Sequence, residues 1–220
     1  MTDDERLSLA LPFRFEGRLR YLLARMEFTL EDGELLTDNE DMFLTFASSQ
    51  GALAFAARRF PEIPAATTDQ EELATLRRGL EEMYAPAVHL YELDAAAEWA
   101  RQPGGPRPDP VVLLEAWRLL AWAGLAPEPA RYDPMGLAGL YMSRSSDEEG
   151  RARDALIETS MKLDGIVRDR ERVRNRGESP DDQWAEHETM WSVADAERVS
   201  GILSAGLHAL SERLRDEWEP

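Results

Sequence analysis

The alternation of hydrophobic and polar positions near the start of the chain predicts extended structure. Met26–Leu30 alternates between the two kinds of residue, Glu31-Asp32-Gly33 contains the Asp-Gly signal of a tight turn, and an apolar run resumes at Leu35. These three features together predict a β-hairpin.

A third strand and a helix are expected directly after the hairpin. Residues Met42–Phe46 form a short apolar run typical of a strand, and Ser48 or Ser49 can cap the helix that follows. Pro61 ends this helix. Its apolar side is expected to hold Leu53, Ala56, Ala57 and Phe60.

Three further elements are expected before residue 102. Helical spacing of leucines and the capping pair Asp69 and Glu72 predict a helix over Asp69–Met83. Val88–Leu93 is a candidate strand, and Asp94 can cap a brief helix through Trp99.

The segment 109–124 predicts a central buried helix. Asp109 supplies an N-cap, Pro110 suits the first helical position and Gly124 supplies a stop. The helix is apolar nearly all round, and its only charged residues are Glu115 and Arg118. Trp117 and Trp122, which lie on different sides of this helix, are expected to pack in the core.

Two long amphipathic helices are expected in the last third of the chain. A capping box at Ser146–Glu149 opens the first, and the second starts near Ser192 and Asp195. The segment before them, 135–142, is expected to be a tight packing or turn segment. The inner stripes are Ala152, Leu156, Leu163 and Val167 in the first helix, and Val199, Leu203, Leu207, Leu210 and Leu214 in the second.

This order of elements predicts an α+β fold: a helix-rich single domain over 1–220 with a small antiparallel sheet in the N-terminal half. The proline- and glycine-rich loop 102–110 is a possible internal boundary. It separates an N-terminal α+β part, 1–101, from a C-terminal helical part, 110–220.

Composition narrows the classes of protein to consider. The 220 residues carry 43 acids and 25 bases, a net charge of −18, which disfavours binding to nucleic acids and anionic membranes. No apolar run reaches the length of a membrane span, and the first residues are acidic, so a cytoplasmic location is expected. Cysteine is absent and Lys162 is the only lysine.

The sequence contains no recognisable catalytic, cofactor-binding or metal-binding motif, so none of these sites is assigned. The three histidines, His89, His187 and His208, lack partners at metal-ligand spacing, and glycine-rich phosphate loops are absent. The arginines of residues 168–176 alternate with acids and are expected to lie on a solvated helical face.

Two acidic blocks without a single base are the strongest anomaly in the chain. One spans residues 178–197. Concentrated negative charge accelerates encounter with a basic protein, although solubility and turn chemistry explain such blocks equally simply. The other block, spanning residues 31–41, contains the predicted partner-binding residues Glu31, Asp32, Glu34, Asp38, Glu40 and Asp41.

The segments "FLTFASSQGALAFAARR" (43–59), "HLYELDAAAEWARQP" (89–103) and "DPVVLLEAWRLLAWAG" (109–124) resemble a pattern found in small acidic bacterial proteins. Some proteins of this kind are encoded beside toxins as immunity partners. The resemblance covers about residues 40–125 and rests on core positions. It implies a non-enzymatic protein that neutralises a basic effector.

We therefore expect an acidic protein that binds and neutralises a basic toxin or enzyme through residues 31–41. Two alternatives stay open. One is an enzyme that uses carboxylates, with His89 or His187, on a small molecule. The other is a structural or regulatory subunit that associates with itself; the sequence leaves the oligomeric state undefined.

Overall fold

The computed structural model describes residues 6–27, 33–38, 40–61, 65–66, 90–102, 109–176 and 191–215. The chain forms two compact units. Unit 1 comprises Met1–Asp94 and Leu207–Pro220, and unit 2 comprises Ala95–Gly206. The first division therefore follows Asp94, whereas the sequence suggested a boundary in the loop 102–110.

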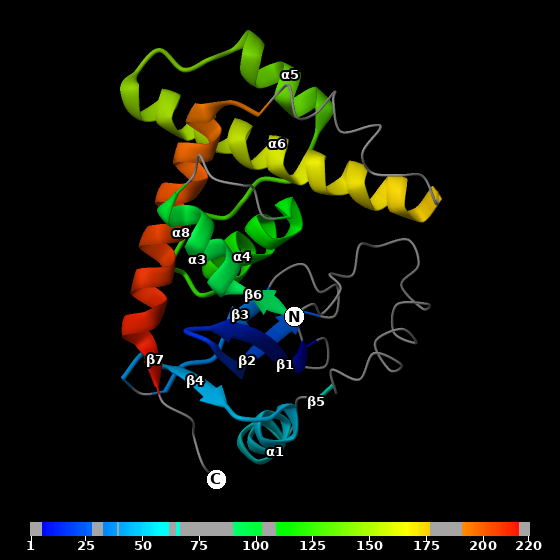
Figure 1. Cartoon of the computed structure of the whole chain (residues 1–220), viewed down its shortest axis with the longest axis vertical. Helices are drawn as coiled ribbons and strands as arrows, with labels where there is room; N and C mark the ends of the chain where they lie inside the picture. The colour runs from blue at the N-terminus through cyan, green and yellow to red at the C-terminus, as the bar shows by residue number, and fades with distance from the viewer. Residues whose placement is uncertain are drawn as a thin grey trace. The chain divides into compact units, whose positions relative to one another are not determined.

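A mixed β-sheet forms the centre of unit 1 (Figure 1). β2 pairs antiparallel with β1, β3 and β4, whereas β5 and β6 pair parallel with β1, and β7 pairs parallel with β4. The strands are β1 (Arg6–Phe15), β2 (Arg18–Glu27), β3 (Gly33–Leu35), β4 (Phe43–Phe46), β5 (Ala65–Ala66), β6 (Tyr91–Glu92) and β7 (Leu214–Arg215).

The predicted α+β class is confirmed, but the sheet is not purely antiparallel. The parallel strands β5, β6 and β7 are two residues long. Runs this short carry no readable alternation, so their pairing could not be predicted. β7 also brings the end of the chain into a sheet that was expected to lie in the N-terminal half.

The longest pair of strands, β1 and β2, was missed except for the end of β2. The apolar residues Leu9, Leu11, Phe13 and Phe15 do alternate along β1 and are buried. Pro12 interrupts the pattern, and a proline normally argues against a strand interior. Here Pro12 lies between the residues that pair with β5 and those that pair with β6.

The turn between β1 and β2 is closed by Asp94. Glu16 and Gly17 have φ angles of 54° and 73°, the left-handed region that glycine tolerates best. The Asp94 carboxylate accepts hydrogen bonds from the backbone N–H groups of Glu16 (2.7 Å) and Gly17 (2.9 Å). Asp94 was expected to cap a helix; it lies inside α3 (Leu93–Arg101) and serves this turn.

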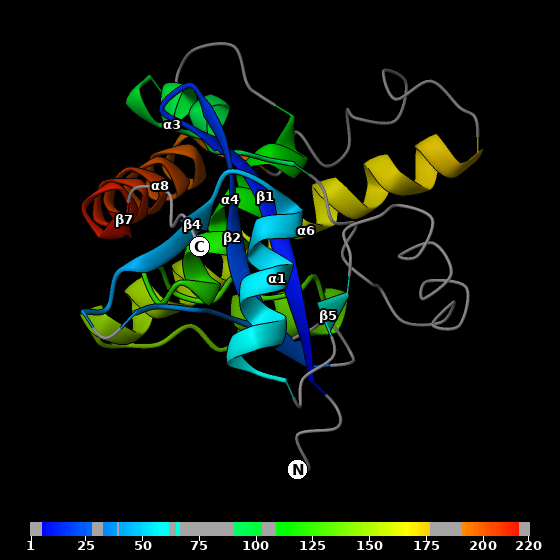
Figure 2. The same cartoon turned by 90° about the horizontal axis from the view of Figure 1, so that it is seen from below.

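The predicted third strand and the helix after it are confirmed as β4 and α1 (Ser49–Arg59). The Ser48 side chain caps α1 by accepting a hydrogen bond from the Gly51 N–H at 3.1 Å. The helix packs on one face of β1 and β2 (Figure 2). The core beneath it is formed by Ala10, Leu23, Leu36, Leu44, Phe46, Ala52 and Ala56.

Unit 2 is helical and contains the predicted buried helix, α4 (Pro110–Trp122). Asp109 caps it with a hydrogen bond from the Val111 N–H at 3.1 Å, and Gly124, with φ of 66°, follows its end. Trp117 is completely buried, and its indole N–H donates to the Pro127 carbonyl at 2.7 Å.

The other helices of unit 2 partly match the expectations. The inner stripes of α6 (Glu148–Arg176) and α8 (Val193–Arg213, in unit 2 up to Gly206) include the expected buried residues Leu163, Val167, Val199 and Leu203. In α6, however, Asp147 rather than Ser146 accepts the capping bond from Gly150 N–H, at 2.7 Å.

The expected turn segment 135–142 is instead a helix, α5 (Pro134–Met142). Asp133 caps it by accepting from the Met135 N–H at 3.0 Å, with Pro134 at the first position. The two glycines in this segment favour a turn, whereas Asp133 and Pro134 just before it are the signal of a helix start.

Several expectations fall outside the described residues. These are the helix over Asp69–Met83, most of the hairpin turn at Glu31–Gly33, and most of the loop 102–110. Within the described part of the chain, we find no helix that combines the length and apolar character needed to cross a membrane.

We expect Trp117→Ala to lower the free energy of unfolding by about 3–5 kcal/mol, because it leaves a large cavity in the core of unit 2. Trp122→Ala is the matched control on the same helix. Since Trp122 is only half-buried, its truncation should cost clearly less. Urea unfolding followed by circular dichroism measures both; equal losses would contradict the central position of Trp117.

Candidate functional site

The described part of the predicted acidic block lies between β3 and β4 in unit 1. Asp38, Glu40 and Asp41 are described there, whereas only the backbone of Glu34 is described, in β3. Glu31 and Asp32 lie outside the described residues.

Asp38 organises this turn. Its Oδ1 accepts hydrogen bonds from the backbone N–H groups of Glu40 (2.8 Å) and Met42 (3.1 Å), and its Oδ2 pairs with the guanidinium of Arg215. Desolvation raises the pKa of the carboxyl, but these bonds and the arginine outweigh it and hold the pKa below its ordinary value of 3.8.

Arginines of the C-terminal segment meet this acidic turn. Arg215 also lies 3.5 Å from a carboxylate oxygen of Glu40, and the Arg213 Nε donates to the Asp41 carbonyl at 2.9 Å. In β4, Thr45 Oγ1 donates to the Arg215 carbonyl at 2.7 Å. Asp38 and Glu40 thus have a local counter-ion and help to hold β7; their binding to a partner stays a prediction.

The second acidic block leads into a network of charges in unit 2. Of this block the structure describes residues 191–197. Asp195, on the first turn of α8, has only 2% of its surface exposed. Ser192 caps the helix: its N–H and hydroxyl donate to Asp195 Oδ2 at 3.0 and 2.7 Å, and its Oγ accepts from the Asp195 N–H at 3.2 Å.

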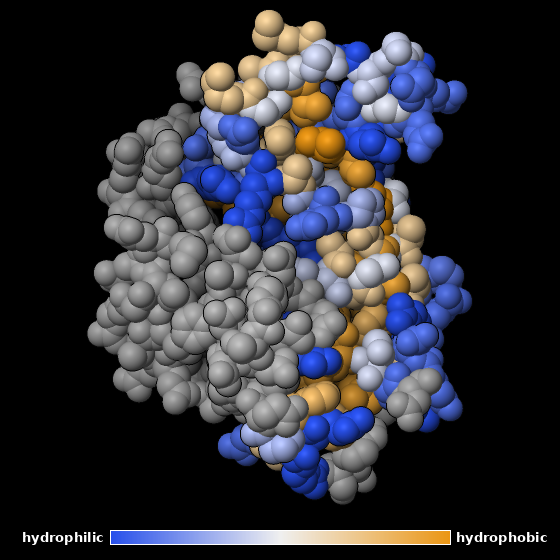
Figure 3. Space-filling view, turned by 180° about the vertical axis from the view of Figure 1, so that it is seen from behind, coloured by the Kyte–Doolittle hydropathy of each residue, from blue (hydrophilic) through white to orange (hydrophobic). Residues whose placement is uncertain are grey.

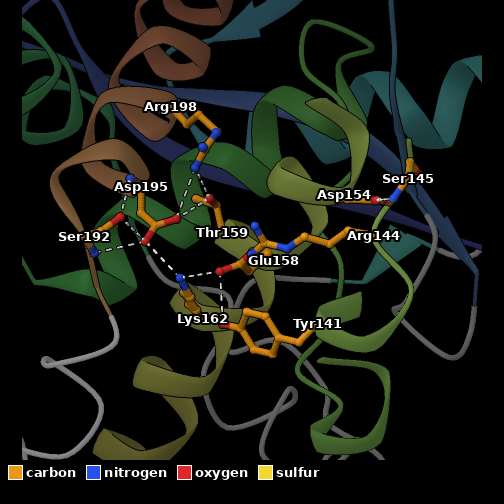
Figure 4. A network of polar contacts seen from close by, with 10 residues as sticks. All are labelled: Tyr141, Arg144, Ser145, Asp154, Glu158, Thr159, Lys162, Ser192, Asp195 and Arg198. Atoms are coloured by element: carbon orange, nitrogen blue, oxygen red, sulfur yellow. Dashed lines mark hydrogen bonds and ion pairs between the residues drawn. The ribbon is translucent and has the colours of Figure 1, made fainter. Parts of the chain in front are cut away.

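Lys162 on α6 joins Asp195 to Glu158. Its Nζ lies 2.7 Å from Glu158 Oε1 and 3.1 Å from Asp195 Oδ2 (Figure 4). Thr159 Oγ1 donates to Asp195 Oδ1 at 2.5 Å, and Arg198 approaches the same oxygen at 3.2 Å. We call these five residues the Lys162 network.

Residues from α5 and the segment after it complete the surroundings of Glu158. The Tyr141 hydroxyl donates to Glu158 Oε1 at 3.0 Å, and Arg144 donates to Oε2 at 3.0 Å. Arg144 also lies over the Tyr141 ring, 5.6 Å from its centroid. Nearby, Asp154 accepts from the Ser145 N–H at 2.8 Å.

The surroundings of Lys162, Glu158 and Asp195 shift the pKa values of these groups further from neutral pH. Burial opposes the charge on Lys162, but hydrogen bonds to Glu158 and Asp195 outweigh it and raise the pKa of the lysine above 10.5. Burial likewise opposes charge on the two acids, yet the bonds they accept leave the pKa of Glu158 below 4.5 and that of Asp195 below 3.8. All three groups are therefore charged at neutral pH.

A pocket of about 190 Å³ opens beside this network. Four cationic and three anionic side chains contribute to its wall, so it carries one positive charge in excess inside a strongly acidic chain. Its lining residues are Leu140, Arg144, Arg151, Asp154, Ala155, Glu158, Lys162, Ser192, Asp195 and Arg198.

α5 presents an exposed hydrophobic surface. Met135 and Met142, seven positions apart and so on the same side of the helix, are 80% and 89% exposed. Ala138 and Gly139 between them are also exposed. Figure 3 shows hydrophobic colours gathering at the upper end of the view, where α5 lies. We call these four residues the α5 face.

The remaining candidates from the sequence add no site. His208 is largely exposed, as expected, whereas His89 and His187 lie outside the described residues. In the arginine-rich segment, Arg168 pairs with the buried Asp164 at 2.8 Å rather than facing solvent alone. Among the described residues, no group of three or more potential metal ligands comes together.

The sequence did not predict the Lys162 network. The sequence shows a single lysine, Lys162, and a helix start near Ser192 and Asp195, but it contains no signal that links the two. One available signal was the i,i+4 spacing of Glu158 and Lys162 on a single helix face. The contact with Asp195 depends on how α6 and α8 pack, which spacing does not reveal.

Comparison with protein-family models, curated proteins and solved structures finds no match to this chain.

We expect Asp38→Ala to lower the urea midpoint of unfolding more than Glu40→Ala does. The first change removes two backbone hydrogen bonds and the ion pair with Arg215, whereas the Glu40 side chain is 72% exposed and has a single long contact. Circular dichroism during urea titration compares the two variants. Equal midpoints would contradict the structural role of Asp38.

The Lys162 network predicts a loss of stability in acid. Because the pKa values of Glu158 and Asp195 are lowered in the folded state, their contribution is present above the ordinary values of 4.5 and 3.8. It is lost as the pH falls through the lower folded values. Asp195→Asn should flatten this part of the pH profile of unfolding, and an unchanged slope would argue against the network.

Proposed function

We propose that this protein is a cytoplasmic, non-catalytic binding protein that docks a basic macromolecule of toxin or enzyme type and neutralises it by covering its working surface. The observation that carries this proposal is the α5 face, an exposed apolar helix surface in a chain of net charge −18. Exposed apolar surface rimmed by polar residues is typical of interaction sites.

The composition of α5 supports an anchoring role. None of its nine residues is charged, and its Leu137 is buried, which attaches the helix while Met135 and Met142 stay exposed. Methionine side chains are flexible and polarizable, so they adapt to the shape of a partner. Burying two of them supplies the hydrophobic part of the binding free energy.

The charges around α5 favour a basic partner. A second copy of this chain would bring another 18 negative charges, and the two copies would repel each other. A basic partner is attracted instead, and complementary potential raises the rate of association. The charged residues in 127–149 are the acids Glu128, Asp133, Asp147, Glu148 and Glu149 and the bases Arg131 and Arg144.

The state of the Lys162 network weighs against acid and base catalysis at this pocket. A general acid or base works best with a pKa near the operating pH. Here the pKa of Lys162 is raised and those of Glu158 and Asp195 are lowered, so each group is held in its charged form. This pattern is typical of a structural ion network.

The test begins with affinity capture of the partner from the native cell, followed by binding measurements with the purified partner. Met142→Asp should weaken the affinity about tenfold or more, because it replaces an exposed apolar side chain of the contact with a charge. Leu19→Asp is the control, since Leu19 is also exposed but lies on β2 in unit 1.

The same partner tests the acidic block of residues 31–41. Glu40→Lys should slow association at low salt and leave the dissociation rate nearly unchanged, because Glu40 is an exposed charge. If Leu19→Asp weakened the affinity as much as Met142→Asp does, the binding role of the α5 face would be contradicted. An acidic partner, or a dimer in light scattering that Met142→Asp dissociates, would overturn the proposal.

A further inference from the structure

We propose that the pocket beside the Lys162 network is a binding site for a small phosphate group, either inorganic phosphate or the phosphate of a small metabolite. The site is separate from the α5 face and concerns a ligand of a different kind. The evidence for this site is the set of hydrogen-bond donors and acceptors that the pocket leaves unused.

Most carboxylate oxygens of the pocket already accept hydrogen bonds from the protein. Asp195 accepts from Lys162, Thr159, Ser192 and Arg198, so both of its oxygens are bonded. The oxygens of Glu158 receive Lys162, Tyr141 and Arg144. Asp154 is bonded to Ser145. A ligand that brings hydrogen-bond donors therefore has few free acceptors to meet.

The arginines of the pocket retain free donors. A guanidinium group has five N–H donors. Among the described residues, Arg151 donates to the Ser146 carbonyl at 2.5 Å, and Arg144 donates through one nitrogen to Glu158. Arg198 uses one terminal nitrogen for both Thr159 and Asp195. The unused capacity of this pocket is consequently donor capacity, which an anion rich in acceptor oxygens satisfies.

The positions of the arginines favour a phosphate group over a carboxylate. Arg144 follows α5, Arg151 lies on the second turn of α6, and Arg198 lies on α8, so the donors reach the pocket from three elements. A tetrahedral group with three exposed oxygens can accept from several directions, whereas a carboxylate offers two oxygens in one plane. A volume of about 190 Å³ suits a ligand of this small size.

Local electrostatics point the same way. The pocket has one more cation than carboxylate, although the chain as a whole has far more acids than bases. Ser192 also brings the N-terminal end of α8 to the pocket wall, where the helix dipole adds positive potential. An anion that is repelled by the rest of the chain therefore finds a favourable local field here.

The experiment titrates the full chain with inorganic phosphate, glycerol phosphate and succinate by calorimetry, at constant ionic strength set with sodium chloride. Phosphate or glycerol phosphate should bind with a dissociation constant below about 1 mM, and succinate should bind at least about tenfold more weakly. Tighter binding of glycerol phosphate than of phosphate identifies a metabolite as the ligand; the reverse order identifies the free ion.

Arg151→Gln is the decisive variant, because Arg151 lies outside the Lys162 network and its loss leaves the buried ion pairs intact. It should weaken phosphate binding about tenfold. Arg153→Gln is the matched control, since Arg153 is an exposed arginine on the same helix that does not line the pocket. Circular dichroism confirms that both variants are folded.

The proposal is overturned if wild type binds none of the phosphate probes at about 10 mM, if succinate binds as tightly as phosphate, or if both arginine variants lose affinity equally. The outcome is independent of the proposed function. Met142→Asp should bind phosphate as wild type does, and Arg151→Gln should bind the macromolecular partner as wild type does.

Discussion

The constraint that organises the helical unit is the burial of the Asp195 carboxylate. A charged group in a protein interior has to be surrounded by hydrogen-bond donors, or its desolvation costs several kcal/mol. Asp195 meets this condition with donors from α6, from Ser192 just before α8 and from Arg198 within α8. The hydrogen bonds to Asp195 therefore fix the position of α6 relative to the start of α8, in addition to the burial of apolar side chains. Sliding one helix along the other would leave a buried charge unpaired.

A second buried carboxylate extends the same principle along α6. Asp164 accepts from Arg118 on α4 at 2.8 Å, from Arg168 at 2.8 Å, and from the Tyr132 N–H at 2.7 Å. The inner side of α6 thus carries Lys162 and Asp164 as well as the apolar Leu163 and Val167. Part of the buried side of this helix is therefore polar, and Lys162 and Asp164 there each have specific partners.

The sequence predicted the parts of the fold that depend on local chemistry. Caps at Ser48 and Asp109 could be predicted because a capping side chain bonds backbone groups two or three residues away. The partners of Asp94 and Asp38 were not recognised, because Glu16 and Arg215 lie 78 and 177 residues away. Nothing in the sequence near either aspartate distinguishes a residue that closes a distant turn from one that caps a helix or faces a partner.

The same distinction changes how the negative charge of the chain is understood. In the sequence, Asp38 and Asp195 belong to two acidic blocks without bases, but in the described structure each is bonded to a basic residue from elsewhere in the chain. Membership of an acidic block in the sequence therefore does not make Asp38 or Asp195 part of an unpaired acidic surface. The docking surface proposed above rests instead on exposed apolar side chains, which are most prominent on the α5 face among the described residues. In the proposed function, charge would select which partners approach this face, and apolar burial would determine the affinity.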